Sequence, residues 1–140
     1  MKREDRGFTL IELMVVVVII GILGVVALNT FVLKGEKAKW DATKGIIAKI
    51  AGQVDSFKLD HNKYPDKLED LLARPSYVDP SAWRGGYVKK REELQDAWKK
   101  DLIYRVPGSQ EEPYDLVSFG ADGEEGGDGN DEDIWNHDNH

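Results

Sequence analysis

The chain has 140 residues, a formal net charge of −7 and no cysteine, so it has room for one domain and cannot be stabilised by a disulfide. The acidic balance argues against nucleic-acid binding, because an anionic surface repels phosphate. Charge is distributed unevenly, since the run from Leu13 to Leu33 contains no charged residue and the chain after it is strongly polar. A soluble part this small needs an additional stabilising element beside its core.

The N-terminal segment consists of a charged leader, MKREDRG (1–7), and a long apolar run. At about 1.5 Å per residue, a helix over Leu13 to Leu33 crosses a hydrocarbon core of about 30 Å. The run is longer than the apolar region of a secretory signal and lacks its small-residue cleavage site, although a plain signal-anchor is an alternative. Glu12 lies at the start of this run, where a carboxylate is costly unless it has a partner. The pattern predicts one membrane-spanning helix and a functional role for Glu12.

The segment Gly7-Phe8-Thr9-Leu10-Ile11-Glu12 resembles the processing site of type IV pilins and pseudopilins. The resemblance implies that a prepilin peptidase cleaves the Gly7–Phe8 bond, that Phe8 is N-methylated, and that Glu12 pairs with the N-terminal amine of a neighbouring subunit. Such pairing sets the register of packed helices, because each subunit presents one amine and one carboxylate. The resemblance also implies a cytoplasmic N-terminus and a periplasmic head, which the nearly balanced basic residues around the run do not decide.

The segment after Lys34 continues the helical pattern, with these apolar positions: Ala38, Ile46, Ile47, Ile50, Val54 and Phe57. Their spacing predicts an amphipathic helix, and Pro65 ends it because proline cannot continue the hydrogen-bond pattern. One helix from Phe8 to about Asp60, with a transmembrane half and an amphipathic half, is therefore expected. A short helix at 67–73 and three strands follow, at 86–90, 102–106 and 114–119. The expected fold is α+β, with the long helix packed on a small antiparallel β-sheet.

Three segments of the head narrow the resemblance to the major pseudopilin of type II secretion: DHNKYP (60–65), LQDAWKKDLIY (94–104) and YDLVSFGADGEEGGDGNDEDIWN (114–136). Ala97 and Lys99 stand where that family has Pro and Gly around its Trp. Ala27-Leu28-Asn29 replaces a region where the family usually has Pro, which leaves open whether the helix is continuous there. The resemblance implies a pilin-like lollipop with a cleaved leader (1–7), a transmembrane and filament-core half of the helix (8–33) and a periplasmic head (34–140).

Carboxylates crowd a glycine-rich C-terminal stretch, Gly120 to Asp133. Clustered carboxylates repel one another unless a cation lies between them, and oxygen ligands without His or Cys suit Ca²⁺. A solvated acidic loop is the alternative, which composition alone leaves equally open. The resemblance implies a structural calcium ion, for which the expected ligands are Asp122, Asp133, Asp131 and the backbone carbonyls of Leu116 and Ser118. Asp128 and Glu132 are the alternatives to Asp131.

The motifs point to a structural protein and not to an enzyme, because the chain has no recognisable nucleophile motif, phosphate-binding loop or pair of catalytic acids. The resemblance implies a major pseudopilin that polymerises into the inner-membrane filament that drives type II secretion. Its expected partners are further copies of itself in a helical homopolymer, minor pseudopilins, the prepilin peptidase/N-methyltransferase and the inner-membrane assembly platform. A type IV pilin of a surface fibre is the alternative, although such pilins commonly close the C-terminal loop with a disulfide. A membrane-anchored calcium-binding module is a third hypothesis, which leaves the Gly7–Phe8 motif unexplained.

Overall fold

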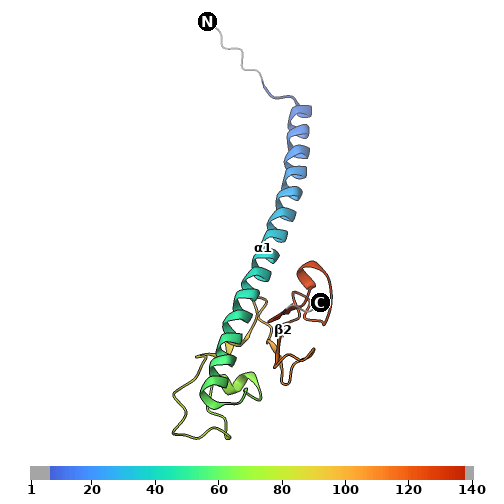
Figure 1. Ribbon diagram of the computed structural model, residues 1–140. Helices are drawn as coiled ribbons and strands as arrows, with labels where there is room; N and C mark the ends of the chain where they lie inside the picture. Colours follow the sequence, from blue (N-terminus) through green and yellow to red (C-terminus); the bar gives the residue numbers. More distant parts are fainter. Residues whose placement is uncertain (1–6, 138–140) are drawn as a thin grey trace. The chain divides into compact units, whose positions relative to one another are not determined.

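The computed structural model describes residues 7–137, except for the side chain of Asn29. The chain divides into two compact units, of which the first ends at Gly35 and the second starts at Glu36. Helix α1 belongs to both units, whereas every strand in the described residues belongs to the second (Figure 1). The second unit, from Glu36 onward, is called the head below.

Helix α1 (Leu10–His61) is 52 residues long, which confirms the prediction of one long N-terminal helix. The backbone stays helical through residues 27–29, and the Thr30 hydroxyl donates a hydrogen bond to the Val26 carbonyl at 3.0 Å. The helix is therefore continuous where the sequence left the question open. It ends at His61 because Asn62 has a φ of 53°, the left-handed conformation that terminates helices, shortly before Pro65.

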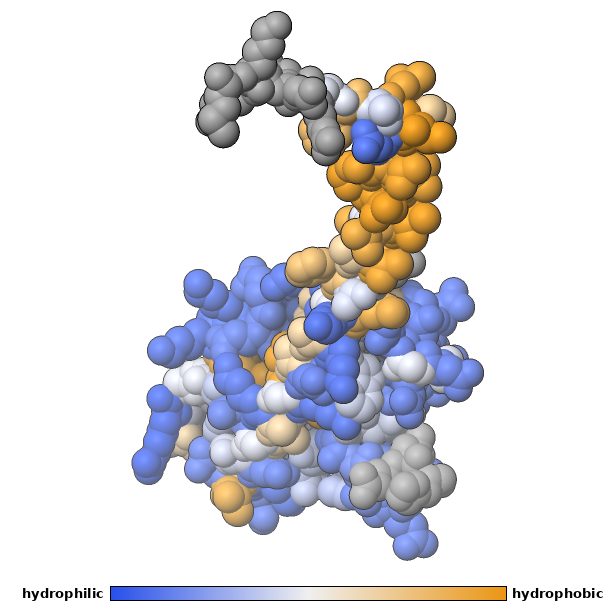
Figure 2. All heavy atoms as spheres, turned by 90° about the horizontal axis from the view of Figure 1, so that it is seen from above, coloured by the Kyte–Doolittle hydropathy of each residue, from blue (hydrophilic) through white to orange (hydrophobic). Residues whose placement is uncertain are grey.

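The first unit exposes its apolar side chains. From Leu10 to Leu33 the large hydrophobic residues are all exposed, for example Val17 at 68% and Phe31 at 79%. An 18-residue window of α1 reaches a mean hydropathy of 3.0, so the helix is long and apolar enough to cross a membrane. Figure 2 shows hydrophobic atoms over the visible face of this helical segment. Such a surface is stable against lipid or against other apolar helices, and not in water.

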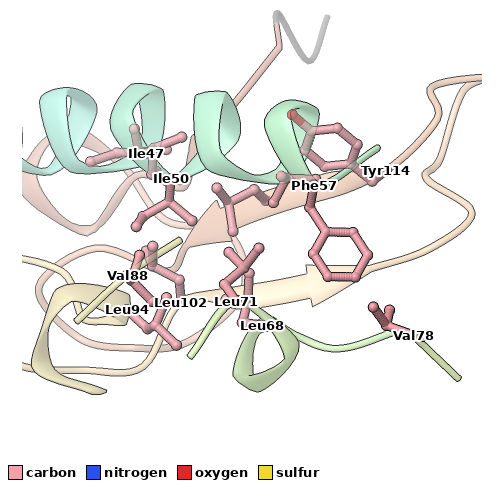
Figure 3. Packing of buried hydrophobic residues seen from close by; sticks show 13 residues of the cluster. Ile47, Ile50, Phe57, Leu68, Leu71, Val78, Val88, Leu94, Leu102 and Tyr114 are labelled. Atoms are coloured by element: carbon pink, nitrogen blue, oxygen red, sulfur yellow. The ribbon is translucent and has the colours of Figure 1, made fainter. Parts of the chain in front are cut away.

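The core of the head forms between the second half of α1 and the segments that follow it. The helix contributes four residues, each at most 2% exposed: Ile47, Ile50, Val54 and Phe57. The later segments supply the other side of the core (Figure 3): Leu68, Leu71, Val78, Val88, Leu94, Leu102, Tyr114, Leu116 and Ile134. The predicted apolar face is thus confirmed from Ile47 onward. At its N-terminal end Thr43 is buried, whereas Ala38 is exposed.

The sheet has three short antiparallel strands in the order β1-β2-β3: β1 (Ile103–Arg105), β2 (Asp115–Ser118) and β3 (Ile134–Trp135). Tyr104 is paired with Leu116, and Val117 with Trp135. Two of the predicted strands are therefore confirmed with narrower bounds. The third strand lies after the acidic stretch, so β2 and β3 hold the two ends of that stretch together.

The strand predicted at 86–90 is wrong. The backbone N–H groups of Tyr87 and Val88 both donate to the Leu71 carbonyl, at 2.8 and 3.2 Å, so the segment is a bend bonded to Leu71 and not a strand. A Cβ at Gly86 would lie 2.8 Å from the Leu72 carbonyl, so this backbone packs directly against the segment after α1. The adjacent residues Tyr87 and Val88 are thus bonded to the end of a 3₁₀ helix, η1 (Leu68–Leu71), which lies within the short helix predicted at 67–73.

A second 3₁₀ helix, η2 (Arg91–Leu94), is joined to α1 through Glu93. The Glu93 carboxylate accepts hydrogen bonds from Lys49 Nζ at 2.6 Å and from the backbone N–H groups of Lys89 and Lys90 at 2.9 and 3.2 Å. The Lys49 ammonium, together with these N–H groups, lowers the pKa of Glu93 from 4.5 to about 2. The ionised carboxylate thus ties η2 to the helix.

The low pKa of Glu93 predicts an acid-sensitive contribution to stability. Because the pKa is lower in the folded state, the contribution is complete above pH 4.5 and is lost as the pH falls toward about 2. We expect the thermal unfolding midpoint of Glu93→Gln, measured by circular dichroism, to change less with pH across this interval than the midpoint of the wild type. Glu92→Gln, at the exposed neighbouring position, is the control and is expected to keep the wild-type slope. Identical slopes for all three proteins would contradict the prediction.

In the turn around Trp98 the backbone of Lys99 adopts the left-handed conformation, with a φ of 65°. Side chains with a Cβ are strained in this conformation, whereas glycine is not. We expect Lys99→Gly to raise the free energy of unfolding by about 1 kcal/mol, measured by urea denaturation. Lys99→Ala keeps a Cβ and is expected to give no comparable gain. Equal stability of the glycine and alanine variants would show that the backbone strain is negligible.

Candidate functional site

The predicted processing junction lies ahead of helix α1. Gly7 and Phe8 are outside the helix, and Phe8 is 81% exposed. A Cβ built at Gly7 has no heavy atom within 4 Å, so its surroundings are open. The bond between the two residues therefore lies outside the helix in open surroundings, in the position that the motif predicts.

Glu12 lies in the first turn of α1 and forms a capping box with Thr9. Its Oε2 accepts hydrogen bonds from the backbone N–H of Thr9 at 2.8 Å and from the Thr9 hydroxyl at 3.0 Å, while the Thr9 Oγ1 accepts from the Glu12 N–H at 3.3 Å. Such reciprocal bonds satisfy N–H groups that a helix start otherwise leaves unpaired. Glu12 thus has a local role, helix capping, beside its predicted role in assembly.

The acidic stretch forms a defined loop between β2 and β3, called the acidic loop below (Gly120–Asp133). Ala121 N–H donates to the Asn130 carbonyl at 3.0 Å, which links the two sides of the loop. Gly127 has a φ of 95°, and a Cβ there would lie 2.6 Å from the Asp131 carbonyl oxygen. Glycine at this position therefore permits a close backbone approach that no other residue allows.

Asp133 carries an unusual carboxylate at the end of the acidic loop. Its Oδ2 accepts a hydrogen bond from Gly126 N–H at 3.0 Å, whereas its Oδ1 is buried and has no hydrogen-bond partner among the described residues. Burial raises the pKa of Asp133, and repulsion from Glu125 and Asp122 adds to this effect. A buried carboxylate oxygen without a donor is unfavourable, so this atom is the one observation in the loop that is consistent with the predicted cation.

The remaining predicted ligands lie along the same loop and the strand before it. Asp122 Oδ1 accepts a hydrogen bond from Glu124 N–H at 3.0 Å. The Leu116 carbonyl accepts from Asn136 N–H at 2.9 Å, and the Ser118 hydroxyl donates to Asp96 at 2.7 Å. In the part of the chain that the structure describes, no three His, Cys, Asp or Glu side chains converge closely enough to hold a metal ion. The predicted carboxylates are thus neighbours in the loop but are not brought together.

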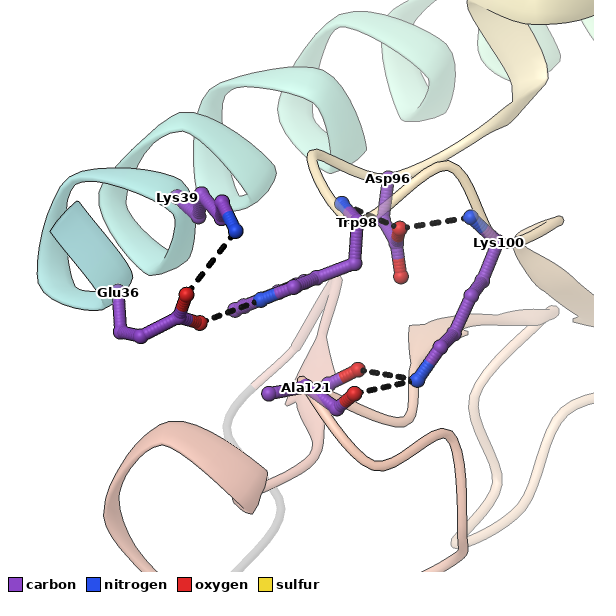
Figure 4. A network of polar contacts seen from close by, with 7 residues as sticks. Glu36, Lys39, Asp96, Trp98, Lys100 and Ala121 are labelled. Carbon is purple, nitrogen blue, oxygen red and sulfur yellow. Dashed lines mark hydrogen bonds and ion pairs between the residues drawn. The ribbon is translucent and has the colours of Figure 1, made fainter. Parts of the chain in front are cut away.

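A polar network that sequence reasoning missed holds the start of the acidic loop to the rest of the head. Asp96, 3% exposed, accepts hydrogen bonds through Oδ1 from the N–H groups of Trp98 and Lys100 at 2.9 and 3.0 Å, and through Oδ2 from Ser118. Trp98 Nε1 donates to Glu36 of α1 at 2.7 Å (Figure 4). The turn at 96–100 therefore connects the long helix, strand β2 and the acidic loop.

These features define a class of protein, the pilin-like membrane-anchored subunits, by a long apolar N-terminal helix and a small antiparallel sheet. The family model of type II secretion system protein G matches residues 31–137, and the model of the prokaryotic N-terminal methylation motif matches residues 2–28. The chain therefore belongs to the type II secretion system protein G family.

Individual relatives support this assignment along the whole chain. Type II secretion system core protein G of Pseudomonas aeruginosa is 43% identical, with 99% of each chain covered. The protein of the same name from Vibrio cholerae is 40% identical over 96% of this chain and 92% of its own. The crystal structure of the major pseudopilin from the type 2 secretion system of enterohaemorrhagic Escherichia coli aligns with a TM-score of 0.56 at 28% identity, covering 74% of this chain and 90% of that one. The fold is thus that of a major pseudopilin.

Proposed function

We propose that this major pseudopilin is cleaved between Gly7 and Phe8, is N-methylated on Phe8, and polymerises through its apolar helix into the filament of type II secretion. The observation that carries the proposal is the exposed Gly7–Phe8 junction just before the N-terminal part of α1, in which the large apolar side chains from Leu10 to Leu33 are all exposed. The protein acts as a structural subunit. When the subunits pass from the membrane into the filament, their apolar helices pack against one another. This packing buries the apolar side chains and stabilises the polymer.

Glu12 has the assembly role in this proposal. Cleavage after Gly7 creates an amine on Phe8, and Glu12 of an adjacent subunit supplies the opposite charge. In the single chain the Glu12 carboxylate is satisfied by Thr9, so it is stabilised before assembly. During assembly the Glu12 carboxylate would exchange its hydrogen bonds with Thr9 for an ion pair with the amine of a neighbouring subunit. This pair favours the axial offset between subunits at which the amine and the carboxylate are in contact.

The location of the subunit in the cell follows from its apolar N-terminal helix and the processing motif before it. We infer an inner-membrane protein with a cytoplasmic N-terminus and a periplasmic head, which contacts the prepilin peptidase/N-methyltransferase, minor pseudopilins and the assembly platform in addition to copies of itself. The support for this orientation is the processing motif at residues 7–12, because basic residues flank the span on both sides.

Calcium is proposed as the structural ion of the acidic loop. The residues that would hold it are Asp122, Asp131, Asp133 and the backbone carbonyls of Leu116 and Ser118. The support is the buried Oδ1 of Asp133, which lacks a donor, in a loop whose side-chain ligands are oxygens. When bound, the ion supplies the positive charge that lets these carboxylates approach one another. Since the chain has no disulfide, this loop would provide its extra stabilisation.

Intact mass spectrometry of the protein purified from its native membrane tests the proposal. The expected mass is that of Phe8–His140 plus one methyl group. Gly7→Val is expected to retain the full leader, and because a Cβ at Gly7 contacts nothing within 4 Å, the head of this variant should melt as the wild type does. A wild-type chain that still begins at Met1, or that is cut near Asn29, would show that the chain is not processed as a pseudopilin.

A further inference from the structure

Lys100 reaches from the Trp98 turn to the beginning of the acidic loop. Its ammonium donates a hydrogen bond to the Ala121 carbonyl at 2.5 Å and makes a longer contact of 3.5 Å with the Gly120 carbonyl (Figure 4). Its side chain lies across Gly123, where an added Cβ would be 2.8 Å from Nζ. The ammonium is therefore in contact with the turn that leads from β2 into the acidic loop, residues 119–123, which is called the first turn below.

The backbone of Lys100 is held on the other side by a buried group. Lys100 N–H donates to Asp96 Oδ1 at 3.0 Å, and Asp96 N–H donates to the Lys100 carbonyl at 2.8 Å. Asp96 also accepts from Ser118 at the end of β2. A lysine whose backbone is fixed in this way loses less conformational freedom when its ammonium binds a carbonyl.

The contacts of Lys100 are separate from the atom that marks the proposed calcium position. That atom is Oδ1 of Asp133, and the basic side chain that acts on this carboxylate is Arg105, whose charge opposes the rise that burial causes in the pKa. Arg105 also lies 3.8 Å from Glu125. Lys100 instead binds the carbonyls of Gly120 and Ala121. Two regions of the acidic loop are thus contacted by different cationic side chains.

We propose that Lys100 is a positioning residue of the acidic loop, whose ammonium holds the first turn in its folded conformation before any metal ion binds. The negative charge of the loop opposes folding, and a cation fixed at the turn offsets part of that repulsion. The Gly123 N–H, which donates to the Phe119 carbonyl at 3.2 Å, reports on this turn. In combination with the calcium site proposed above, on which this step rests, the ordered turn limits the rearrangement that Asp122 needs to reach the ion.

Hydrogen exchange of the full-length protein in detergent micelles with EDTA tests the proposal. In Lys100→Met, exchange at residues 119–123 is expected to accelerate roughly 10- to 100-fold, the effect of losing a hydrogen bond from a charged donor. Lys99→Met changes the charge equally at the exposed neighbouring position and is expected to exchange as the wild type does. Lys100→Arg retains a cation and should restore most of the protection. Lys100→Gln serves as a second loss variant should the methionine variant fold poorly.

Calorimetric titration with CaCl₂ supplies a second readout. Lys100→Met is expected to bind calcium more weakly than the wild type, because only the fraction of molecules with an ordered turn is competent to bind. Unchanged exchange in EDTA for both loss variants would overturn the proposal, and so would tighter calcium binding by Lys100→Met, since the ammonium would then compete for the metal position. Absence of calcium binding in every protein would reject the calcium site alone, whereas the exchange data in EDTA would still decide the role of Lys100.

Discussion

Replacing Glu12 by valine is expected to abolish filament assembly while leaving the head folded. The substitution removes the carboxylate that we propose to pair with a neighbour's N-terminal amine, and the amine is then buried without an opposite charge. Loss of one partner of a buried ion pair weakens association on the order of 10²- to 10³-fold per contact. The measurement is the amount of sheared, sedimentable filament from cells that contain the complete secretion apparatus, normalised to the amount of pseudopilin in the membrane.

Glu12→Gln separates the assembly charge from the helix cap. Glutamine retains an oxygen that accepts from the Thr9 N–H and hydroxyl, which in the wild type lie 2.8 and 3.0 Å from the carboxylate. It therefore keeps most of the capping contribution, about 1 kcal/mol, and loses only the charge. We expect Glu12→Gln to fail in assembly as Glu12→Val does. Normal filaments from the glutamine variant together with reduced filaments from the valine variant would assign Glu12 to capping and not to intersubunit pairing.

The long helix could be predicted because its signals are local. The uncharged run and the spacing of Ile47, Ile50 and Phe57 define it within a single stretch of chain, and Asn62 and Pro65 lie at its end. The short strands depend on partners far away in the sequence. Segment 86–90 has the aromatic and β-branched residues of a strand but bonds to Leu71, and β3 contains only two paired residues, so neither outcome is encoded locally.

The candidate sites divide in the same way. Gly7, Phe8 and Glu12 were predicted because the processing motif is contiguous. The Thr9–Glu12 cap was missed although Thr-x-x-Glu before an apolar run is its known signature. By contrast, the bonds from Lys100 to Ala121 and from Ser118 to Asp96 join segments about twenty residues apart, and no spacing rule relates them.

Removing calcium is the second change for which we expect a large effect, on the stability of the head. An ion that binds the folded state alone adds about 2.7 kcal/mol at a concentration 100-fold above its dissociation constant. For a head of roughly 100 residues, EDTA should then lower the thermal midpoint by about 10–20 °C relative to saturating calcium. Circular dichroism of the full-length protein in detergent micelles, with equal ionic strength in both buffers, measures the difference.

Asp133→Asn and Glu124→Gln form the matched pair for the calcium prediction. Asparagine at 133 removes the charge from the carboxylate whose Oδ1 is buried without a donor, so calcium should no longer shift the midpoint. Part of the stability in EDTA should be regained, because repulsion from Glu125 and Asp122 is relieved. Glu124 is exposed and outside the proposed ligand set, so its variant should respond to calcium as the wild type does. A midpoint that is the same in EDTA and in calcium for the wild type would mean that the loop is held by its own backbone bonds and by Lys100, with no structural ion.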